Sequence, residues 1–325
     1  MVSPITTRYS RPRLAAALAV LAAVLPATTA RAQTPLFQTG FEAAQGFSAT
    51  VATPLTVYAA DGTPGTFTPT PGTLYDQAAP NNNYGFLSPE TSVAAVQSAV
   101  NGVRVVNNSA ASGAQSVLFD GAVLGAQDVR YFEPDAYNIA VNGTLNVGID
   151  MRVLNPSANF GQWGINLVSQ TASVAAFGFV GGNVLASPDS GTTLYAALNP
   201  TTGTPITASY GAYNNYAIQM NYAARTFGAT FNGVSVGFVP VDASGSPTGN
   251  PVAAIPFRPG TPNHVEYVAF GQAIQRGASE SANFDNLRVS GTGVTVAPEA
   301  GTLALFLPTL GIAGALVARR VRRRK

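Results

Sequence analysis

The sequence predicts an all-β protein built from two antiparallel sheets that pack as a sandwich, and three observations support this prediction. Between Gln33 and Val296, apolar and polar residues alternate with a period of two, and no long segment has a helical repeat. Turn pairs such as Asp61-Gly62 and Asn142-Gly143 recur along this region. The region is also rich in Thr, Val, Ala and Gly, as expected for many short strands.

Two regions carry the clearest strand signals. Leu145–Val153 alternates strictly, with apolar residues on one face and polar residues or Gly on the other. Tyr216–Tyr222 shows the same alternation, and Asn232-Gly233 then lies between two further alternating runs. Asn-Gly favours a two-residue hairpin turn, because both turn residues need a positive φ. We therefore predict a three-strand meander over 216–239.

Shorter apolar runs complete the predicted sandwich. One domain spans residues 33–290, since no charged or low-complexity linker divides it. The Pro-, Gly- and Asn-rich stretch Ala59–Glu90 is predicted to be an elaborated surface loop, and Gly291–Ala297 a short linker. The further predicted strands are Val103–Val106, Ser116–Phe119, Gly164–Ser169, Val174–Val180, Val265–Phe270 and Phe284–Val289.

Composition and charge exclude several classes of function. The chain has no Cys and one His, which excludes disulfides, a Cys nucleophile and a two-His zinc site. Its formal charge of +2 is unevenly distributed, because most of the cations lie before position 33 or after position 318. Residues 33–297 contain seven Arg, no Lys and 14 acidic residues, a net charge of −7. Nucleic acid is therefore not an expected partner, because binding phosphates requires clustered Lys and Arg.

Residues 1–32 are predicted to be a secretory signal peptide. Three Arg precede an apolar run at Leu14–Leu25, and small residues lead to Ala32, after which signal peptidase is expected to cleave. An N-terminal membrane anchor is the alternative reading. The apolar run is short for that role, because it extends only about 18 Å as a helix, against a hydrocarbon core of about 30 Å.

The C-terminal segment 298–325 has the features of a membrane segment. Pro298-Glu299 precedes an uncharged run at 302–318, which extends about 26 Å as a helix, and a basic tail follows at 319–325. Such a tail stays in the cytoplasm, so the region before Pro298 is expected outside. From these residues alone, the segment is a transmembrane anchor.

The same segment resembles the PEP-CTERM sorting signal of exosortase-processed bacterial surface proteins. Pro298 and Glu299 match the first two positions of that motif, whereas the third, usually Pro, is Ala300; Arg319 and Arg320 begin the Arg cluster. The resemblance implies processing by an exosortase-type protease at the inner membrane. It also implies delivery to the cell surface or extracellular matrix, where such proteins are often linked to biofilm. An uncleaved membrane anchor is the alternative.

The body resembles the concanavalin-A/laminin-G-like sandwiches of exported bacterial proteins. The resemblance rests on Phe41-Glu42, on Tyr216–Gly233 with its Asn-Gly turn, and on Ala282–Val289 as a closing strand. It implies a jelly-roll-like sandwich and no particular activity.

The sequence contains no clear catalytic set, and we predict that the chain is not an enzyme. Gly233–Gly237 fits G-x-S-x-G, but its Ser lies in a β meander instead of a strand-to-helix elbow. A sandwich glycosidase needs two facing carboxylates, whereas Glu133-Pro134-Asp135 places its acids around a Pro that favours a turn.

Asp285, Glu42 and Asp120 are candidate ligands of a structural calcium ion, and no other cofactor is expected. Alternation places Asp285 on the face of Leu287 and Val289, toward the core, where an ionised carboxylate needs a cation or hydrogen bonds. Calcium binds several oxygen ligands, which the Asn- and Asp-rich loops can supply. The alternative is that Asp285 accepts hydrogen bonds from N–H groups of a turn.

Two clusters of Tyr and Asn are candidates for contacts with a glycan. Tyr rings stack on the C–H patches of sugars, and amides bond to hydroxyls. The same residue types are also common in turn-rich surfaces. The candidates are Tyr75, Asn83 and Tyr84 in one cluster, and Tyr210, Tyr213 and Asn214 in the other.

These observations predict an exported β-sandwich protein of the cell envelope or extracellular matrix with a structural or adhesive role. A lectin-like module that binds exopolysaccharide is the alternative, and a polysaccharide-acting enzyme is a third hypothesis. The expected partners are signal peptidase, the exosortase-type protease, exopolysaccharide and, during sorting, the inner membrane.

Overall fold

The computed structural model describes most of the chain between Gln33 and Ala297. The described residues are 33–45, 47, 49–50, 55–58, 64–67, 102–124, 129–133, 136–155, 162–169, 172–189, 193–242, 245–273 and 280–297. The predicted signal peptide, the segment 298–325 and most of the predicted loop Ala59–Glu90 lie outside these residues.

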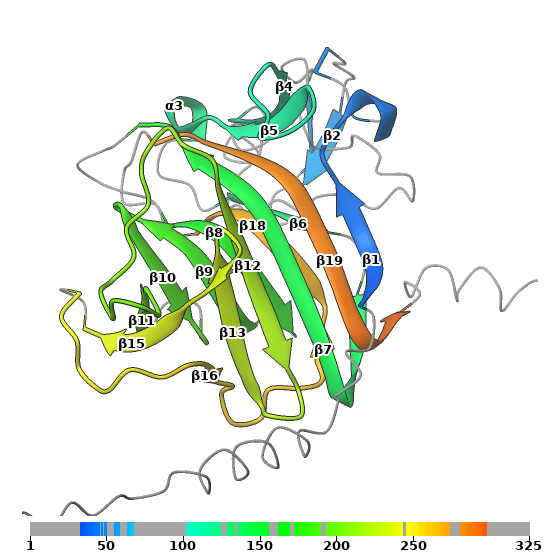
Figure 1. Ribbon diagram of the computed structural model, residues 1–325. Coiled ribbons are helices and arrows are strands. Elements are labelled where there is room, and N and C mark those ends of the chain that lie inside the picture. Colours follow the sequence, from blue (N-terminus) through cyan, green and yellow to red (C-terminus); the bar gives the residue numbers. More distant parts are fainter. Residues whose placement is uncertain are drawn as a thin grey trace, which may run out of the picture. The chain divides into compact units, whose positions relative to one another are not determined.

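A sheet of ten strands forms one layer of the structure (Figure 1). Its strands follow the order β14-β13-β12-β7-β19-β5-β4, with β1 beside β19, β16 beside β13 and β17 beside β7, and all pairs are antiparallel. The strands are β1 Thr34–Thr39, β4 Val103–Asn107, β5 Gln115–Phe119, β7 Ala136–Val153, β12 Asn214–Asn221, β13 Thr226–Phe231, β14 Val234–Ser235, β16 Ile255–Pro256, β17 His264–Val265 and β19 Ala282–Ala297.

A second sheet of seven antiparallel strands forms the other layer, in the order β15-β11-β10-β9-β8-β18-β6. Its strands are β6 Val129–Glu133, β8 Gln162–Ser169, β9 Ala172–Val180, β10 Asn183–Ser187, β11 Leu194–Leu198, β15 Gly237–Val241 and β18 Tyr267–Ala273. Within the described residues, the remaining elements are a hairpin, β2 Leu55–Tyr58 with β3 Pro64–Phe67, and two short helices, η1 Ala43–Gln45 and α3 Gly121–Leu124.

The facing sides of the two sheets bury one large hydrophobic core. On β7, the apolar residues of the alternating run Leu145–Val153 are all buried. They pack with aromatic residues of both sheets. Phe119 and Phe284 of the first sheet lie 6.1 and 6.3 Å from Trp163 of the second, measured between ring centroids. The predicted all-β, two-sheet antiparallel sandwich is therefore confirmed.

The last strand, β19, is longer than predicted and includes the predicted linker. Gly291–Ala297 pairs with β7 from Leu145 back to Ala136, so β7 also begins well before its alternating run. A Cβ at Gly291 would lie 2.5 Å from the carbonyl oxygen of Thr144, so the close approach of these strands requires Gly at this position. Gly is otherwise unfavourable within a strand. The linker prediction for 291–297 is therefore wrong, because the long-range ladder to β7 outweighs the local sequence.

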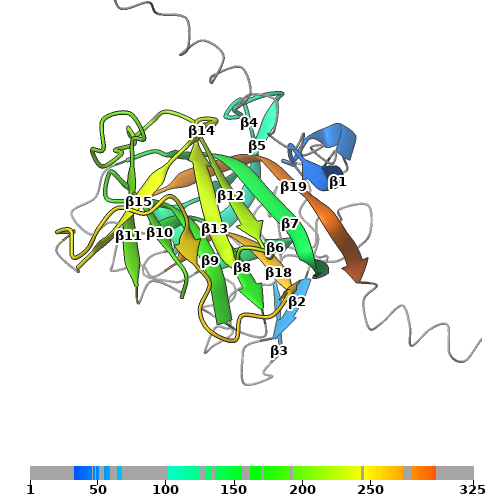
Figure 2. The ribbon, with the colours of Figure 1, turned by 60° about the horizontal axis from the view of Figure 1, so that its bottom comes forward.

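The predicted meander over 216–239 is correct only in its first part. β12 pairs with β13, and Asn232 and Gly233, with φ of 49° and 77°, turn the chain into β14. The chain then crosses to the other layer, where β15 pairs with β11 (Figure 2). The sequence does not reveal this crossing, because apolar residues continue to alternate with Ser235 and Gly237 through Val234–Phe238 while the chain changes sheet.

Three Gly lie in register across the second sheet: Gly178 on β9, Gly164 on β8 and Gly271 on β18. They alternate with core residues such as Trp163 and Phe177, and therefore line the outer face of that sheet. A Cβ at Gly178 would lie 1.9 Å from the carbonyl oxygen of Trp163. Only Gly allows β8 and β9 to approach this closely.

Candidate functional site

The outer face of the first sheet carries polar side chains where its central strands lie side by side. On β7, Asp150 alternates with the buried Ile149 and Met151, so its carboxylate points away from the core. The register places Asn215 of β12 on one side of Asp150 and Asp285 of β19 on the other. Paired residues of neighbouring strands project from the same face, so these three side chains meet there.

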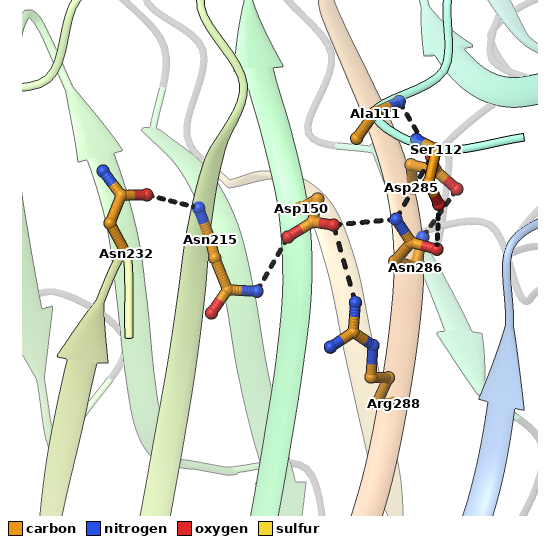
Figure 3. A network of polar contacts seen from close by, with 8 residues as sticks. All are labelled: Ala111, Ser112, Asp150, Asn215, Asn232, Asp285, Asn286 and Arg288. Carbon is orange, nitrogen blue, oxygen red and sulfur yellow. Dashed lines mark hydrogen bonds and ion pairs between the residues drawn. The ribbon is translucent and has the colours of Figure 1, made fainter. Parts of the chain in front are cut away.

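Five residues form a row on this face, joined by hydrogen bonds and one ion pair, which we call the amide–carboxylate cluster: Asp150, Asn215, Asn232, Asn286 and Arg288 (Figure 3). The Asn215 amide donates to Asp150 Oδ1 at 2.7 Å, and the Asn286 amide donates to Oδ2 at 2.8 Å. An Arg288 guanidinium nitrogen lies 3.7 Å from the same Oδ2. Each planar group of the row is therefore held by a neighbour.

The Asn232-Gly233 turn fixes one end of the cluster. Asn232 Oδ1 accepts the backbone N–H of Asn215 at 2.8 Å, and the Asn232 amide donates to Asn214 Oδ1 at 2.9 Å. Asn adopts positive φ more readily than other non-Gly residues, so the residue that makes the turn also supplies an ordered amide. The motif that predicts the hairpin thus contributes to the candidate site.

A β-bulge in β19 forms the other end. The register to β7 shifts between Asp285 and Arg288, and Asn286 has φ of 52°. Phe284 is in the core, and Asp285 pairs with the outward Asp150, so the Asp285 carboxylate lies on the outer face. The prediction that Asp285 shares the core face of Leu287 and Val289 is wrong, because the bulge shifts the alternation by one residue.

Asp285 is nevertheless fully buried, because the loop between β4 and β5 covers it. Its Oδ2 accepts the N–H groups of Ala111 and Ser112 at 2.9 and 3.0 Å, and its Oδ1 accepts that of Asn286 at 2.7 Å. Burial raises the pKa of this carboxyl, the three N–H bonds lower it in part, and the Asp150 charge raises it further. These contacts match the turn-acceptor alternative stated for Asp285.

Glu42 holds the same loop from the N-terminal side. Its Oε1 accepts the N–H groups of Ala114 and Gln115 at 2.8 and 3.2 Å. Gly113 has φ of 76°, a backbone conformation that favours Gly, and a Cβ there would lie 2.0 Å from this oxygen and displace the Glu42 carboxylate. Two carboxylates from distant parts of the chain therefore fasten one loop over the outer face.

Arg152 and Tyr213 complete the support below this loop. The Arg152 guanidinium donates to Ser109 Oγ and, at 3.1 Å, to Asn283 Oδ1, and it lies 5.0 Å from the centroid of the Tyr213 ring. The Tyr213 hydroxyl donates to the Ser109 carbonyl oxygen. Burial raises the pKa of Tyr213 to about 12.

Of the three candidate calcium ligands, the structure brings two to the same loop. Asp285 and Glu42 bind its backbone, as described above. Asp120 follows β5, where it pairs with Arg104 at 2.9 Å and accepts the N–H of Ala122 in α3 at 3.2 Å. Within the described residues, no three His, Cys, Asp or Glu side chains gather as a metal site. Calcium binding stays a prediction.

The candidate glycan contacts are distributed unevenly. Tyr75, Asn83 and Tyr84 lie outside the described residues. Tyr210 donates to the buried Glu280 at 3.0 Å, and its ring packs against Phe179 at 4.9 Å, so it belongs to the edge of the core. Burial and Glu280 raise the pKa of Tyr210 to about 12. Asn214 contacts the cluster through Asn232, whereas Tyr213 contacts Arg152 and Ser109 beneath the β4–β5 loop.

The sorting residues Ala32, Pro298, Glu299, Arg319 and Arg320 lie outside the described residues. The described part of the chain contains no helix with the length and apolar character needed to cross a membrane. The sorting prediction therefore remains a prediction.

Sequence reasoning did not single out the cluster itself. The alternation of Leu145–Val153 places Asp150 outward, and Asn232-Gly233 is a recognisable turn. The meeting of Asp150 with Asn215 and Asn286 depends on strand register, which local patterns do not reveal.

No family model matches the chain, and no curated protein matches it. Several solved structures are similar to it. Cellulose-induced protein Cip1 is 15% identical over 57% of this chain and 84% of its own, with a TM-score of 0.41. Alginate lyase AlgAT5, of polysaccharide lyase family 7, is 11% identical over 60% and 82%, with a TM-score of 0.35. An endo-1,3-β-glucanase from Streptomyces sioyaensis is 12% identical over 80% and 97%, with a TM-score of 0.37.

These comparisons contradict the prediction that the chain is not an enzyme. The similar structures include the glucanase, two alginate lyases, the second from Corynebacterium sp., and a carbohydrate esterase from bacteriophage phi24B. The non-enzyme prediction is therefore withdrawn. At identities of 15% or less, no residue role is transferred from these proteins to this chain.

Proposed function

We propose that the chain is an exported carbohydrate-binding protein of the cell envelope or extracellular matrix, and that the amide–carboxylate cluster is its binding surface. The observation that carries this proposal is the row of mutually fixed amide, carboxylate and guanidinium groups across β12, β7 and β19 and the turn after β13. Such planar groups bond to hydroxyls in pairs, and a polysaccharide presents hydroxyls in a regular array.

Two properties of the row support binding. It crosses four neighbouring strands, a span of about 14 Å at the usual strand spacing, which accommodates a short oligosaccharide. Asn232 and Arg288 are exposed, and Asp150, Asn215 and Asn286 are partly exposed, so a ligand can reach all five. Because the groups are already held in place, little side-chain entropy is lost when a ligand binds.

The proposed location rests on the two ends of the chain. The signal-like segment ending at Ala32 directs export, and the tail beginning at Pro298-Glu299 directs sorting through the inner membrane to the surface. An adhesive role follows from binding exopolysaccharide there. Intact-mass measurement of the protein from its native host tests both cleavages.

The binding proposal is tested with full-length protein and polysaccharides in solution. Asn215→Ala removes one ligand-facing amide and one hydrogen bond that orients Asp150. We expect the affinity for a bound polysaccharide to fall about fivefold to tenfold, as for the loss of one or two hydrogen bonds. Isothermal titration calorimetry against laminarin, soluble cellulose oligosaccharides and alginate measures the effect.

Gln219→Ala is the matched control, because Gln219 is an exposed, outward amide on the same strand, beyond the cluster. It should leave the affinity unchanged. Absence of binding to every polysaccharide tried, or an equal loss in both variants, contradicts the proposed site.

A further inference from the structure

Both guanidinium groups near the cluster are already engaged by the protein. Arg288 forms an ion pair with Asp150 at 3.7 Å. Arg152 is held beneath the β4–β5 loop by Ser109, Asn283 and the Tyr213 ring. Among the described residues at this site, no unpaired cation faces a ligand.

Carboxylates outnumber these cations at the same place. Asp150 lies in the cluster, Asp285 lies beside it, and Glu42 lies on the far side of Gly40. A Cβ at Gly40 would be 3.6 Å from both Asp285 Oδ1 and Glu42 Cγ, which places these acidic side chains close together. Residues 33–297, these side chains included, carry a net charge of −7 and no Lys, so the field around the site is negative.

The hydrogen-bonding groups of the row, like its charge, disfavour an anionic ligand. The Asp150 carboxylate is an acceptor only, and a sugar hydroxyl donates to it readily, as in other charge-assisted bonds. A uronate carboxylate has no proton to donate, so it cannot bond to Asp150 and is repelled by it. The Asn amides accept and donate, and are therefore satisfied by neutral hydroxyls.

We infer that the amide–carboxylate cluster selects a neutral polysaccharide over an anionic one, an inference that rests on the proposed function and names its ligand class. The selection comes from the excess of carboxylates at the described site, where Asp150, Asp285 and Glu42 outnumber the paired Arg152 and Arg288, and from the net negative charge of residues 33–297. Electrostatic complementarity of this kind sets specificity more than overall affinity.

The test compares laminarin, a neutral glucan, with alginate, an anionic polymer, on full-length protein at low ionic strength. We expect laminarin to bind at least about tenfold more tightly, with the difference shrinking as salt screens the charges. Carboxyl-reduced alginate should bind more tightly than alginate itself. Asp150→Asn, which preserves shape and removes the charge, should narrow the ratio of the two affinities.

The outcomes separate the two proposals. Alginate binding as tight as laminarin binding, or a ratio unchanged by Asp150→Asn, overturns the selection of a neutral ligand and leaves the carbohydrate-binding site standing. Failure of laminarin, alginate and carboxyl-reduced alginate to bind overturns the carbohydrate-binding proposal itself.

Discussion

The two outer faces of the sandwich differ in character. That of the first sheet carries Asp150, Gln219 and Arg288, which are partly or fully exposed. That of the second sheet carries the Gly row and small or apolar residues, among them Ala196 and Ala269, which are 8% and 0% exposed. The alternation of apolar and polar residues therefore identifies the solvent-facing side of the strands in the first sheet only. Strands of a sheet that is buried on both faces have nearly continuous apolar sequences instead.

The largest expected effect is the loss of stability caused by a substitution on the buried outer face of the second sheet. Gly178→Ala would place a Cβ 1.9 Å from the Trp163 carbonyl oxygen, a backbone atom that cannot move aside without separating β8 from β9. We expect a loss of about 3 kcal/mol or more in the free energy of unfolding, measured by urea denaturation.

Gly228→Ala is the control on the first sheet. Gly228 lies on β13, and a Cβ there would meet nothing within 4 Å. Its free energy of unfolding should change by less than about 0.5 kcal/mol. Similar losses in the two variants would show that the two faces do not differ in packing as described.

A smaller loss of stability is expected from a substitution beneath the β4–β5 loop, which covers part of the first sheet's outer face. Asp285→Asn replaces one carboxylate oxygen by an amide that faces backbone N–H donors. We expect a loss of about 2 kcal/mol, since a buried N–H donor that faces the new amide is left without an acceptor. Hydrogen exchange at the Ala111 and Ser112 amides should quicken at the same time. Ser112→Ala keeps the backbone N–H and should cost little; a loss equal to that of Asp285→Asn would refute the role of the carboxylate.

The smallest expected effect is the pH dependence of the free energy of unfolding. Its sign should differ between Asp285 in the first sheet and Asp189 next to the second. Asp285 has a raised pKa, so the stability it contributes is complete below about pH 4 and is lost as pH rises through the raised value. Asp189, after β10 of the second sheet, behaves in the opposite way. Burial raises its pKa, but bonds from Thr193 and Ser187 outweigh this and lower it, so its contribution is present above about pH 4 and lost as pH falls.

Unfolding free energies measured between pH 3 and 6 test these signs. The difference between the wild type and Asp285→Asn should decrease with rising pH, and that between the wild type and Asp189→Asn should increase. Slopes of the same sign would contradict the assignment of one pKa direction to each site.

The sequence predicts the sandwich well where one strand face meets solvent. Leu145–Val153 and the Asn232-Gly233 hairpin are correct because local alternation and turn chemistry determine them. It does not predict β1, β10 or β11, whose strands lack a clear polar face or lie near the start of the domain. The candidate site was missed for a related reason. Asp150 and Asn286 are far apart in the chain and meet only through the β7–β19 register and its bulge.

The first and last strands of the described residues are neighbours, since β1 begins opposite Gly291 of β19. The amide–carboxylate cluster lies near the start of β19, and Ala297 ends the strand roughly 30 Å beyond Arg288. Under the proposed binding and sorting functions, tension between a ligand at the cluster and an attachment after Ala297 would run lengthwise along β19. The hydrogen bonds that join β19 to β7 and β1 would then share that load in shear instead of breaking one by one.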